Sequence, residues 1–442
     1  MTFPYPGKPP ERHLPDRLAL RLLVQEFQPE LMDALVDKAE RRERRRRLLP
    51  AQLMMYFALA MWLFGSSSYE EVLARLTGGL PEMFQDVGNP ASAAAIARAR
   101  MRLGVEPLRA LCGHVAASAH GTSAHGTSAQ GVGTAGPGPA GRRVLAFESL
   151  AMEAPDTPAN RAAFGASPKK GHNLTVWLAA LTDCRPRTVA AAAIAPSREQ
   201  AVEGLLAEWP HDLLGTGALV VGDEETLSQP LWNALAESGA DRLWRVGGPL
   251  AGQANGTANG TANGTANGRA GGPLGVRPGG AARDPLPVLR ALPDGSYLST
   301  LTAPAAGGPP RGPRQETVVR VVPYGAAAPG QRRPAVTGPQ GPRLVTSFLD
   351  DAVTADEIVA RYAAAALDRT GVRQFAGQIA GPRVVLRSKS PELVKQEIYA
   401  MLCTYYVVGH LISPMYSDVQ PLLSPDDRRR GCGPDGRPRL SQ

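Results

Sequence analysis

Two low-complexity tracts divide the chain and limit what it can fold into. Residues 119–141 contain the tandem repeat AHGTSAHGTSA, and residues 249–283 contain the repeat ANGTANGTANGTANG. Neither tract carries enough apolar surface to fold alone, and repeats of this kind mark positions that tolerate insertion. We therefore expect a flexible repeat linker at 119–141 and a low-complexity loop at 249–283, with the folded parts before, between and after them.

The segment before the first tract has the apolar spacing of helices. LALRLLVQEF, ELMDALVDKAERR and PASAAAIARARMRLG place apolar residues three and four positions apart. Asp16 is predicted to cap the first helix and Pro29 to begin the second. Ser68 and Glu71 have the spacing of a capping box. We expect an all-helical domain over residues 1–118.

Between the tracts, strand-like and helical segments alternate. RRVLAFESLAM, LTVWLAALTD, RTVAAAAIA, GALVVGD and DRLWRVG are strand-like, whereas SREQAVEGLLAEW and QPLWNALAESG are helical. This order predicts an α/β sheet with mixed strand directions. Residues 142–240 are assigned to the first part of this core.

The segment after the second tract is first strand-like and then helical. VLRALPDGSYLSTL, with a turn at Asp294–Gly295, is followed by ETVVRVVPY and RLVTSFLD, which predicts a mostly antiparallel, β-rich insertion over residues 241–350. EIVARYAAAALDR and SPELVKQEIYAMLCTYYVVGHLI predict a helical end of the core over 351–412. The Pro- and Arg-rich residues 413–442 are expected to form a disordered basic tail.

The charge balance favours a polyanionic partner. The formal net charge is +8, the isoelectric point is about 9.5, and 42 of the 48 basic residues are arginine. Such a balance is typical of proteins that bind nucleic acid or an anionic membrane. A GC-rich coding sequence also enriches arginine, so composition alone leaves the partner open.

The apolar segments and the cysteines bear on the compartment. The longest apolar run, Leu48–Phe64, is short for a membrane span and contains Pro50, and the N-terminus lacks the apolar stretch of a signal peptide. No pair of cysteines has metal-ligand spacing. We expect no membrane contact and reduced thiols in a cytoplasmic protein. The cysteines are Cys112, Cys184, Cys403 and Cys432.

Several long strings resemble the insertion-sequence-4 family of DDE transposases. RRLLPAQLMMYFALAMWLFGSSSYEEVLARL and ARARMRLGVEPLRAL resemble the N-terminal region of that family, and APDTPANRAAFG, LPDGSYLS and GPRVVLRSKSPELVKQEIY resemble its core. The resemblance implies a helical N-terminal DNA-binding domain and a ribonuclease-H-like core with a β-rich insertion. It also implies cut-and-paste strand cleavage and transfer, in which three carboxylates hold two Mg²⁺ or Mn²⁺ ions.

The acid positions of the family are only partly filled by acids in this chain. Counting from the PDTP string, the slot of the first acid is Glu148, and the slot of the second, after GALVV, is Asp223. The third acid of the family lies on a helix in a Tyr–x2–Arg–x3–Glu–x6–Lys signature. Counting from GPRVVLRSK, these four slots are Tyr362, Ala365, Arg369 and Ala376.

These replacements predict a degraded catalytic triad. Glu148 keeps the charge but adds a methylene, and Arg369 cannot ligate a cation. We therefore expect a transposase-like DNA-binding protein that is catalytically impaired or inactive. One alternative is an active transposase in which Glu148 and Asp223 hold the metal and Asp368 or Glu357 supplies the third acid. A second alternative is a non-enzymatic scaffold or oligomerising protein.

Three groups of basic residues are candidates for contact with DNA phosphates. Each has a plainer interpretation as a solvated basic surface, and the helix around Arg98 is either a recognition helix or an ordinary basic helix. We expect a double-stranded DNA partner resembling a transposon end, nucleoid association, and, by resemblance, a homodimer. The candidates are Arg41, Arg42, Arg44, Arg45, Arg46 and Arg47 in one run, Arg98 and Arg102 on one helix, and Arg383, Arg387 and Lys389 near the C-terminus.

Overall fold

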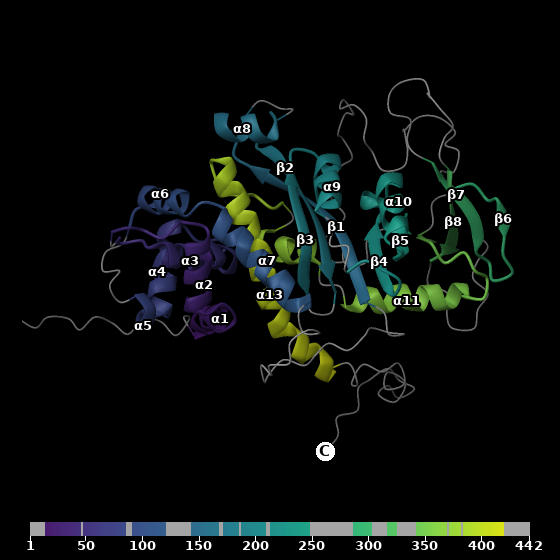
Figure 1. Cartoon of the computed structure of the whole chain (residues 1–442), viewed down its shortest axis with the longest axis horizontal. Coiled ribbons are helices and arrows are strands. Elements are labelled where there is room, and N and C mark those ends of the chain that lie inside the picture. The colour runs from purple at the N-terminus through teal and green to yellow at the C-terminus, as the bar shows by residue number, and fades with distance from the viewer. Residues whose placement is uncertain are drawn as a thin grey trace, which may run out of the picture. The chain divides into compact units, whose positions relative to one another are not determined.

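The computed structural model divides the chain into two compact units (Figure 1). Unit 1 comprises residues 1–115 and 395–442, and unit 2 comprises residues 116–394. Most of the first repeat tract, all of the second, and the predicted tail beyond residue 419 lie outside the described residues. The structure describes residues 14–45, 47–84, 91–120, 143–167, 171–184, 187–208, 213–247, 286–302, 316–324, 342–368, 371–381 and 383–419.

Unit 1 is helical, as predicted. Pro29 is the first residue of its second helix, and Ser68 and Glu71 form the predicted capping box, in which each side chain accepts a hydrogen bond from the backbone N–H of the other residue. Asp16 does not cap the first helix, because that helix begins two residues earlier, at Leu14, and Asp16 lies in its first turn. The helices are α1 Leu14–Glu26, α2 Pro29–Lys38, α3 Ala51–Leu63, α4 Tyr69–Gly79, α5 Pro81–Phe84, α6 Ala93–Leu103 and α7 Glu106–His120.

The apolar helix α3 is the centre of unit 1. Nearly all of its side chains are buried. The C-terminal part of α13 (Pro391–Val419) packs against it: the indole of Trp62 donates to the carbonyl of Glu397 at 2.7 Å, and Thr404 donates to the carbonyl of Leu59 at 3.3 Å. A span of apolar residues with no polar face is therefore explained by burial on all sides. Among the described helices, none is long and apolar enough to cross a membrane.

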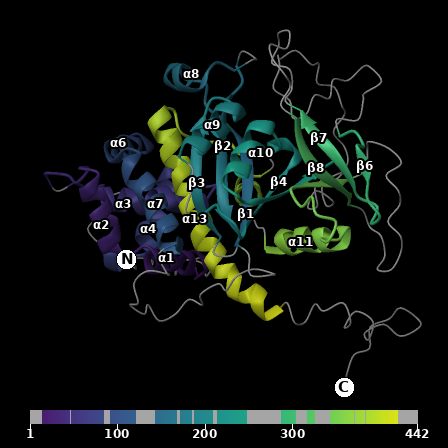
Figure 2. The ribbon, with the colours of Figure 1, turned by 45° about the vertical axis from the view of Figure 1, so that its right-hand side comes forward.

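The described residues of unit 2 form one nine-stranded mixed sheet with the order β3-β2-β1-β4-β5-β9-β8-β7-β6 (Figures 1 and 2). β1 pairs antiparallel with β2 and parallel with β4, and β4 pairs parallel with β5, which confirms the predicted mixture of strand directions. The strands are β1 Arg143–Ala154, β2 Leu174–Asp183, β3 Thr188–Ala195, β4 Ala218–Asp223, β5 Asp241–Val246, β6 Arg290–Ala291, β7 Tyr297–Thr302, β8 Glu316–Pro323 and β9 Arg343–Thr346.

The strands after the second repeat tract extend the same sheet. β6, β7, β8 and β9 pair antiparallel with one another, and β9 pairs with β5. Gly295, with a φ of +83°, lies in the turn between β6 and β7, a backbone conformation that glycine adopts without strain. The antiparallel segment is thus joined edge to edge with the core strands.

Each face of the sheet has its own apolar cluster. One face, with Phe147 and Val220, packs against Trp232 and Leu205 of the helices. The other face carries Ala146 and Val221 of the sheet together with residues of α11. The helices of unit 2 are α8 Pro158–Phe164, α9 Arg198–Ala207, the 3₁₀ turn η4 Glu224–Thr226, α10 Gln229–Glu237, α11 Ala355–Asp368, α12 Val372–Ala380 and the first turn of α13.

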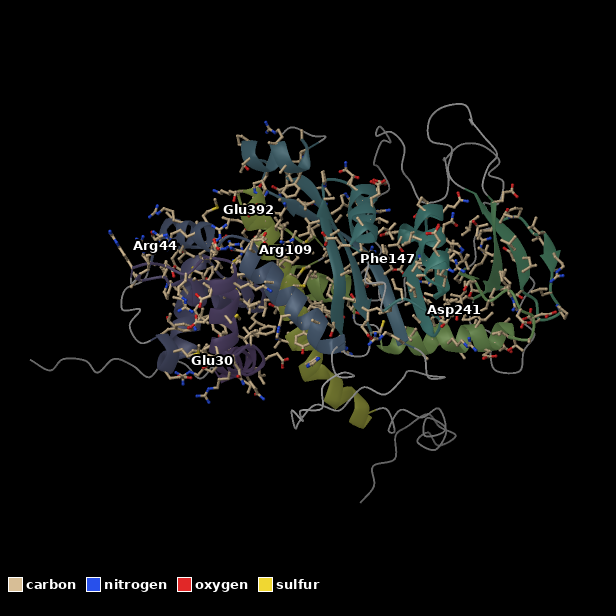
Figure 3. All side chains as sticks on the ribbon, viewed as in Figure 1. Glu30, Arg44, Arg109, Phe147, Asp241 and Glu392 are labelled. Carbon is tan, nitrogen blue, oxygen red and sulfur yellow. The ribbon has the colours of Figure 1, made fainter. Side chains whose placement is uncertain are left out.

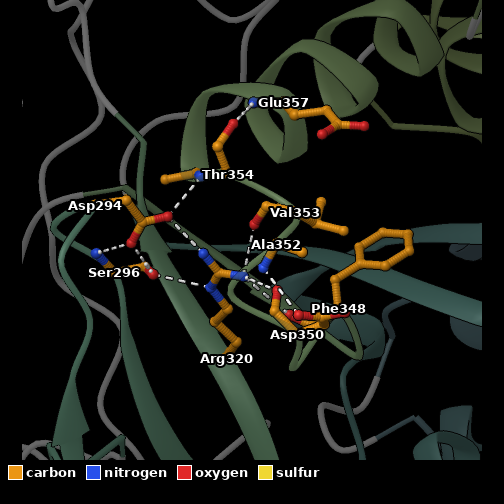
Figure 4. A network of polar contacts seen from close by, with 10 residues as sticks. Asp294, Ser296, Arg320, Phe348, Asp350, Ala352, Val353, Thr354 and Glu357 are labelled. Carbon is orange, nitrogen blue, oxygen red and sulfur yellow. Dashed lines mark hydrogen bonds and ion pairs between the residues drawn. The ribbon is translucent and has the colours of Figure 1, made fainter.

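A buried arginine fixes the start of α11 to the β-rich segment (Figure 4). Arg320 of β8 has no exposed surface and donates to the Ser296 hydroxyl at 2.9 Å, to the carbonyls of Asp350 and Val353, and to the Asp294 carboxylate. Because Asp294 also accepts from the N–H of Ala355, the first residue of α11, the network sets the position of this helix on the sheet.

The helical end of the chain differs from the pattern in two places. α11 ends at Asp368 and α12 begins at Val372, so the segment that carries the signature slots is two helices. α13 continues to Val419, past residue 413 where the tail was expected to begin, although Pro414 lies within it and proline disfavours a helix interior.

Candidate functional site

The strand register places the first two acid slots beside each other. β1 and β4 pair in parallel from Arg143 with Ala218 to Ala146 with Val221. Extending this register by two residues sets Glu148 next to Asp223, and the step of two keeps both side chains on the same face. That face is the one covered by α11. We call Glu148 and Asp223 the acid pair.

The described slots of the third-acid signature lie on two helices, and those of α11 lie on this same face. Tyr362 and Ala365 of α11 are buried in the apolar cluster on this face. The Tyr362 ring packs edge-on against the Tyr324 ring, with the two ring centroids 5.4 Å apart. Ala376 is fully buried on α12. Arg369 and the side chain of Asp368 lie outside the described residues. Two positions that are basic in the family signature are therefore buried alanines here.

Glu148 is engaged by the N-terminus of α12. Its side chain is buried, and its Oε2 atom accepts a hydrogen bond from the backbone N–H of Val372 at 2.7 Å. A Cβ atom on Gly371, the N-cap residue of α12, would overlap the Glu148 carboxyl group. Sequence reasoning missed this contact, because no local pattern connects residues more than 220 positions apart.

Asp223 ends β4 and has a cation beside it. It is half-buried, and the 3₁₀ turn η4 follows directly, with the Thr226 hydroxyl donating to the Asp223 carbonyl at 2.8 Å. In the parallel pairing of β4 with β5, the residue opposite Asp223 is Arg245, which is buried. The adjacent Glu224 accepts a hydrogen bond from the backbone N–H of Gly247 at 2.8 Å. The surroundings of Asp223 thus include a positive charge supplied by the chain.

A second arginine joins α12 to both acid-bearing segments. The Arg373 guanidinium donates to the carbonyl of Ser149 on β1 at 2.6 Å and to the carboxylate of Glu225 on η4 at 2.7 Å. The two side chains of this ion pair are 30% and 47% exposed, so water screens it. Its geometric effect is to hold the first turn of α12 across the segments that follow Glu148 and Asp223.

These donors do not fit the metal pair that the resemblance implies. Two ions that flank a phosphate need several carboxylate oxygens in a fixed arrangement. In the part of the chain that the structure describes, no group of three or more His, Cys, Asp or Glu side chains is placed to hold a metal ion. Glu148 is bound to α12, and Arg245 and Arg373 bring positive charge to the same edge.

Glu357, one alternative for the third acid, lies at the N-terminal end of α11, whereas the residue that contacts Glu148, Val372, comes after the C-terminal end of that helix. Glu357 is in the first turn, beside the network of Figure 4, and its carboxylate accepts from Arg361. At 1.5 Å per residue, it lies roughly 16 Å along the helix from Asp368. The geometry therefore gives Glu357 no role beside the acid pair.

The arginine loop, residues 41–47 of unit 1, lies along the C-terminal end of α6. A Cβ atom on Gly104 would meet the guanidinium carbon of Arg41 at 3.3 Å, and Arg102 donates to the carbonyl of Leu49 at 3.4 Å. Arg44, Arg45 and Arg47 are exposed and make no ion pair with any residue that the structure describes, and Figure 3 shows Arg44 projecting from the unit. Arg46 lies outside the described residues.

Two arginines of the same region are bound to partners within the chain. Arg42 pairs with Asp37 and with Asp33, and the hydrogen bond that its guanidinium donates to Asp37 raises the pKa of Arg42. Arg100 is fully buried and donates to the Gln396 side chain at 2.8 Å and to the Tyr69 hydroxyl at 2.6 Å.

The arginines of α6 therefore differ in exposure according to the face of the helix on which they lie. Arg98 and Arg102, four residues apart, point outward from the helix, whereas Arg100 lies inside unit 1. The outward pair is the part of the candidate recognition helix that remains available to a partner.

The basic segment 383–389 of unit 2 alternates between outward and inward residues. Arg383 and Lys389 are exposed and Arg387 is half-buried, whereas Val384 and Leu386 are buried. The inner side is held by β1: the N–H of Glu153 donates to the Val384 carbonyl at 2.8 Å, and the N–H of Leu386 donates to the Glu153 carbonyl at 2.7 Å.

The two core strings quoted above, APDTPAN and VVLRSKS, meet at this segment. The Thr157 hydroxyl donates to the Lys389 carbonyl at 2.8 Å, and the Asn160 side chain donates to the Ser388 carbonyl at 3.1 Å. The polar residues of the first string thus fix the backbone of the second, so that its cations face outward.

Comparison with known proteins shows that the chain resembles insertion-element transposases. Residues 17–112 match the family described as insertion element 4 transposase N-terminal. The chain is also 25% identical, over 394 residues, to the transposase InsG for insertion sequence element IS4 of Escherichia coli (strain K12). The alignment covers 88% of this chain and 75% of that relative. The predicted resemblance to insertion-sequence-4 transposases is therefore confirmed.

Proposed function

We propose that the chain is a transposase-like DNA-binding protein, derived from a cut-and-paste DDE transposase, that is catalytically impaired or inactive. The observation that carries the proposal is the state of the signature slots. Ala365 and Ala376 are buried in the apolar interior, and Glu148 is bound to the start of a helix. A basic side chain at either alanine slot would need a buried position, where an unpaired charge is costly.

We further propose a ribonuclease-H-like core for unit 2. The supporting observation is the strand order β3-β2-β1-β4-β5, in which the first three strands are antiparallel and the next two are parallel to β1. The acid pair lies on the two central parallel strands, as the resemblance implies for that fold.

The DNA-binding part of the proposal rests on the exposed cations. Arg44, Arg45, Arg47, Arg98 and Arg102 offer unit 1 a surface for phosphates, and Arg383 and Lys389, together with the half-buried Arg387, offer unit 2 another. Phosphate contacts give affinity that falls steeply with salt and depends little on sequence. The proposed partner is double-stranded DNA resembling a transposon end, bound by a monomer or a homodimer.

A single assay reads both parts of the proposal. Full-length protein is incubated with supercoiled plasmid that carries the sequences flanking its own gene, with Mg²⁺ or Mn²⁺, and the gel is read for retardation and for nicking. We expect salt-sensitive retardation without metal-dependent nicking. Nicking that Asp223→Ala abolishes, and that Asp351→Ala at an exposed loop acid leaves intact, would identify an active transposase. Absence of retardation at moderate salt would identify a scaffold.

A further inference from the structure

We infer that Glu148 is a positioning residue: its carboxylate anchors the N-terminus of α12 and so holds that helix against β1. The inference deepens the proposed function, since it states what now occupies the slot of the first acid. It depends on the proposed function only for the loss of cleavage, because the anchoring of α12 can be measured without DNA or metal.

The surroundings of the carboxylate are those of a buried helix cap. Glu148 is 7% exposed, and a buried carboxylate is unfavourable unless hydrogen bonds and positive charge compensate it. The N–H of Val372 at 2.7 Å supplies the hydrogen bond, and the N-terminal end of the nine-residue helix α12 supplies partial positive charge. The helix start thus gives Glu148 the positive partner that a metal ion gives a catalytic acid.

The space around Gly371 supports the anchoring of α12 by Glu148 independently of the hydrogen bond. The backbone conformation of Gly371, with φ of −73° and ψ of 164°, is open to any residue, so the conformation itself does not require glycine. The available space does require glycine, because a Cβ atom at residue 371 would overlap both the Oε1 atom and the carboxyl carbon of Glu148. Glu148 and Gly371 are therefore matched in shape, as a side chain and the gap that receives it.

Other residues of α12 also hold this helix against unit 2. Val372, Phe375 and Ala376 are buried, and Arg373 reaches the Ser149 carbonyl and the Glu225 carboxylate. The helix is therefore fixed by its apolar face, by an arginine and by Glu148 at its first turn. The extra methylene of glutamate matters here, since an aspartate at 148 would withdraw the carboxylate by about 1.5 Å, one carbon–carbon bond.

A double-mutant cycle tests the pairing directly. Gly371→Ala, Glu148→Ala and the double variant are compared with the native full-length chain by hydrogen exchange of peptides from residues 371–381, with β4 peptides as a measure of overall folding. Gly377→Ala, in the same helix but with no atom within 4 Å of the added Cβ, is the matched control. Glu148→Gln keeps the length and one acceptor but removes the charge.

The inference predicts strongly coupled effects. Gly371→Ala and Glu148→Ala should each speed exchange in α12 by about tenfold or more, since each removes a hydrogen bond to a charged group. The double variant should exchange no faster than Glu148→Ala alone, because the overlap is then absent. Glu148→Gln should lie between the native chain and Glu148→Ala, and Gly377→Ala should not speed exchange.

Other outcomes would overturn the inference. Unchanged exchange in Gly371→Ala would show that the carboxylate does not fill that space, and additive effects would show that the two residues act separately. If α12 is anchored as described and the plasmid is nonetheless nicked in a manner that depends on Asp223, the proposed function fails while this inference stands.

Discussion

The acid pair of unit 2 and the arginine loop of unit 1 are both dense in charge, but the structure uses the two regions in opposite ways. Glu148 is buried against α12, and Asp223 has Arg245 beside it. Arg44, Arg45 and Arg47 are exposed and have no acidic partner among the described residues. The charges of the first region are thus compensated within the chain, whereas those of the second remain available to a polyanion.

The largest expected effect is that of restoring a basic residue to the signature. Ala376 has no exposed surface, so Ala376→Lys should destabilise unit 2 by about 3–5 kcal/mol, the cost of an uncompensated buried charge. Gln378→Lys, at an exposed position of the same helix, is the control and should change little. Urea titration followed by hydrogen exchange of unit 2 peptides measures both. If Ala376→Lys were as stable as the native chain, the slot would still be open to a ligand.

The next largest effect concerns a buried arginine compared with a surface one. Arg320→Met removes the donors to Ser296, Asp350 and Val353 and leaves Asp294 without its cation, and it should cost about 3 kcal/mol. Arg42→Met breaks an ion pair whose partners are about half exposed, and should cost little. The same urea titration compares the two variants, and equal losses would refute the distinction drawn between them.

A smaller effect is expected on the acid side of the stability profile. Burial raises the pKa of Asp294, but hydrogen bonds from Ser296 and Ala355 and the charge of Arg320 outweigh it, so the pKa is lowered. A lowered folded-state pKa contributes stability above the ordinary carboxyl range, and that stability is lost as the pH falls through the lowered value. Asp294→Asn should therefore flatten the loss of unit 2 stability between about pH 5 and pH 3, where aspartates titrate. A profile unchanged by the substitution would contradict the assignment.

The smallest effect separates the two kinds of arginine in the loop. Arg45→Ala should reduce the slope of log affinity against log salt by about 0.9, the value for one lost phosphate contact. Arg42→Ala should leave the slope unchanged, because Asp33 and Asp37 already neutralise that side chain. Fluorescence anisotropy with a labelled duplex over a salt series gives both slopes, and an equal decrease in the two variants would refute the comparison.

Local signals in the sequence predict most of the fold. The string LTVWLAALTD coincides with β2 from Leu174 to Asp183, Pro29 begins α2, and the Asp294–Gly295 turn joins β6 to β7. These features depend on caps, turn residues and side-chain periodicity within a few residues. The joining of β9 to β5 and the packing of α13 on α3 depend on contacts far apart in the chain, which no local pattern reports.

The features of the candidate site likewise separate into those that the sequence predicts and those that depend on contacts distant in the chain. The slots at Glu148 and Asp223 follow from resemblance, and their placement side by side follows from a parallel register that only the structure gives. The break before Val372, and the hydrogen bond that Glu148 accepts there, have no signal in the sequence. The arginines of the loop and of α6 are visible in the sequence, but burial and ion pairing decide which of them remain exposed, as Arg100 of α6 and Arg42 of the loop illustrate.

Binding of Mn²⁺ to the full-length chain, followed by electron paramagnetic resonance, tests most directly whether the chain itself compensates the acid pair. We expect the native protein and Asp223→Ala to bind Mn²⁺ indistinguishably, since Glu148 is anchored to α12 and Arg245 lies beside Asp223. A Mn²⁺ site in the native protein that both Asp223→Ala and Glu148→Gln abolish would contradict this expectation.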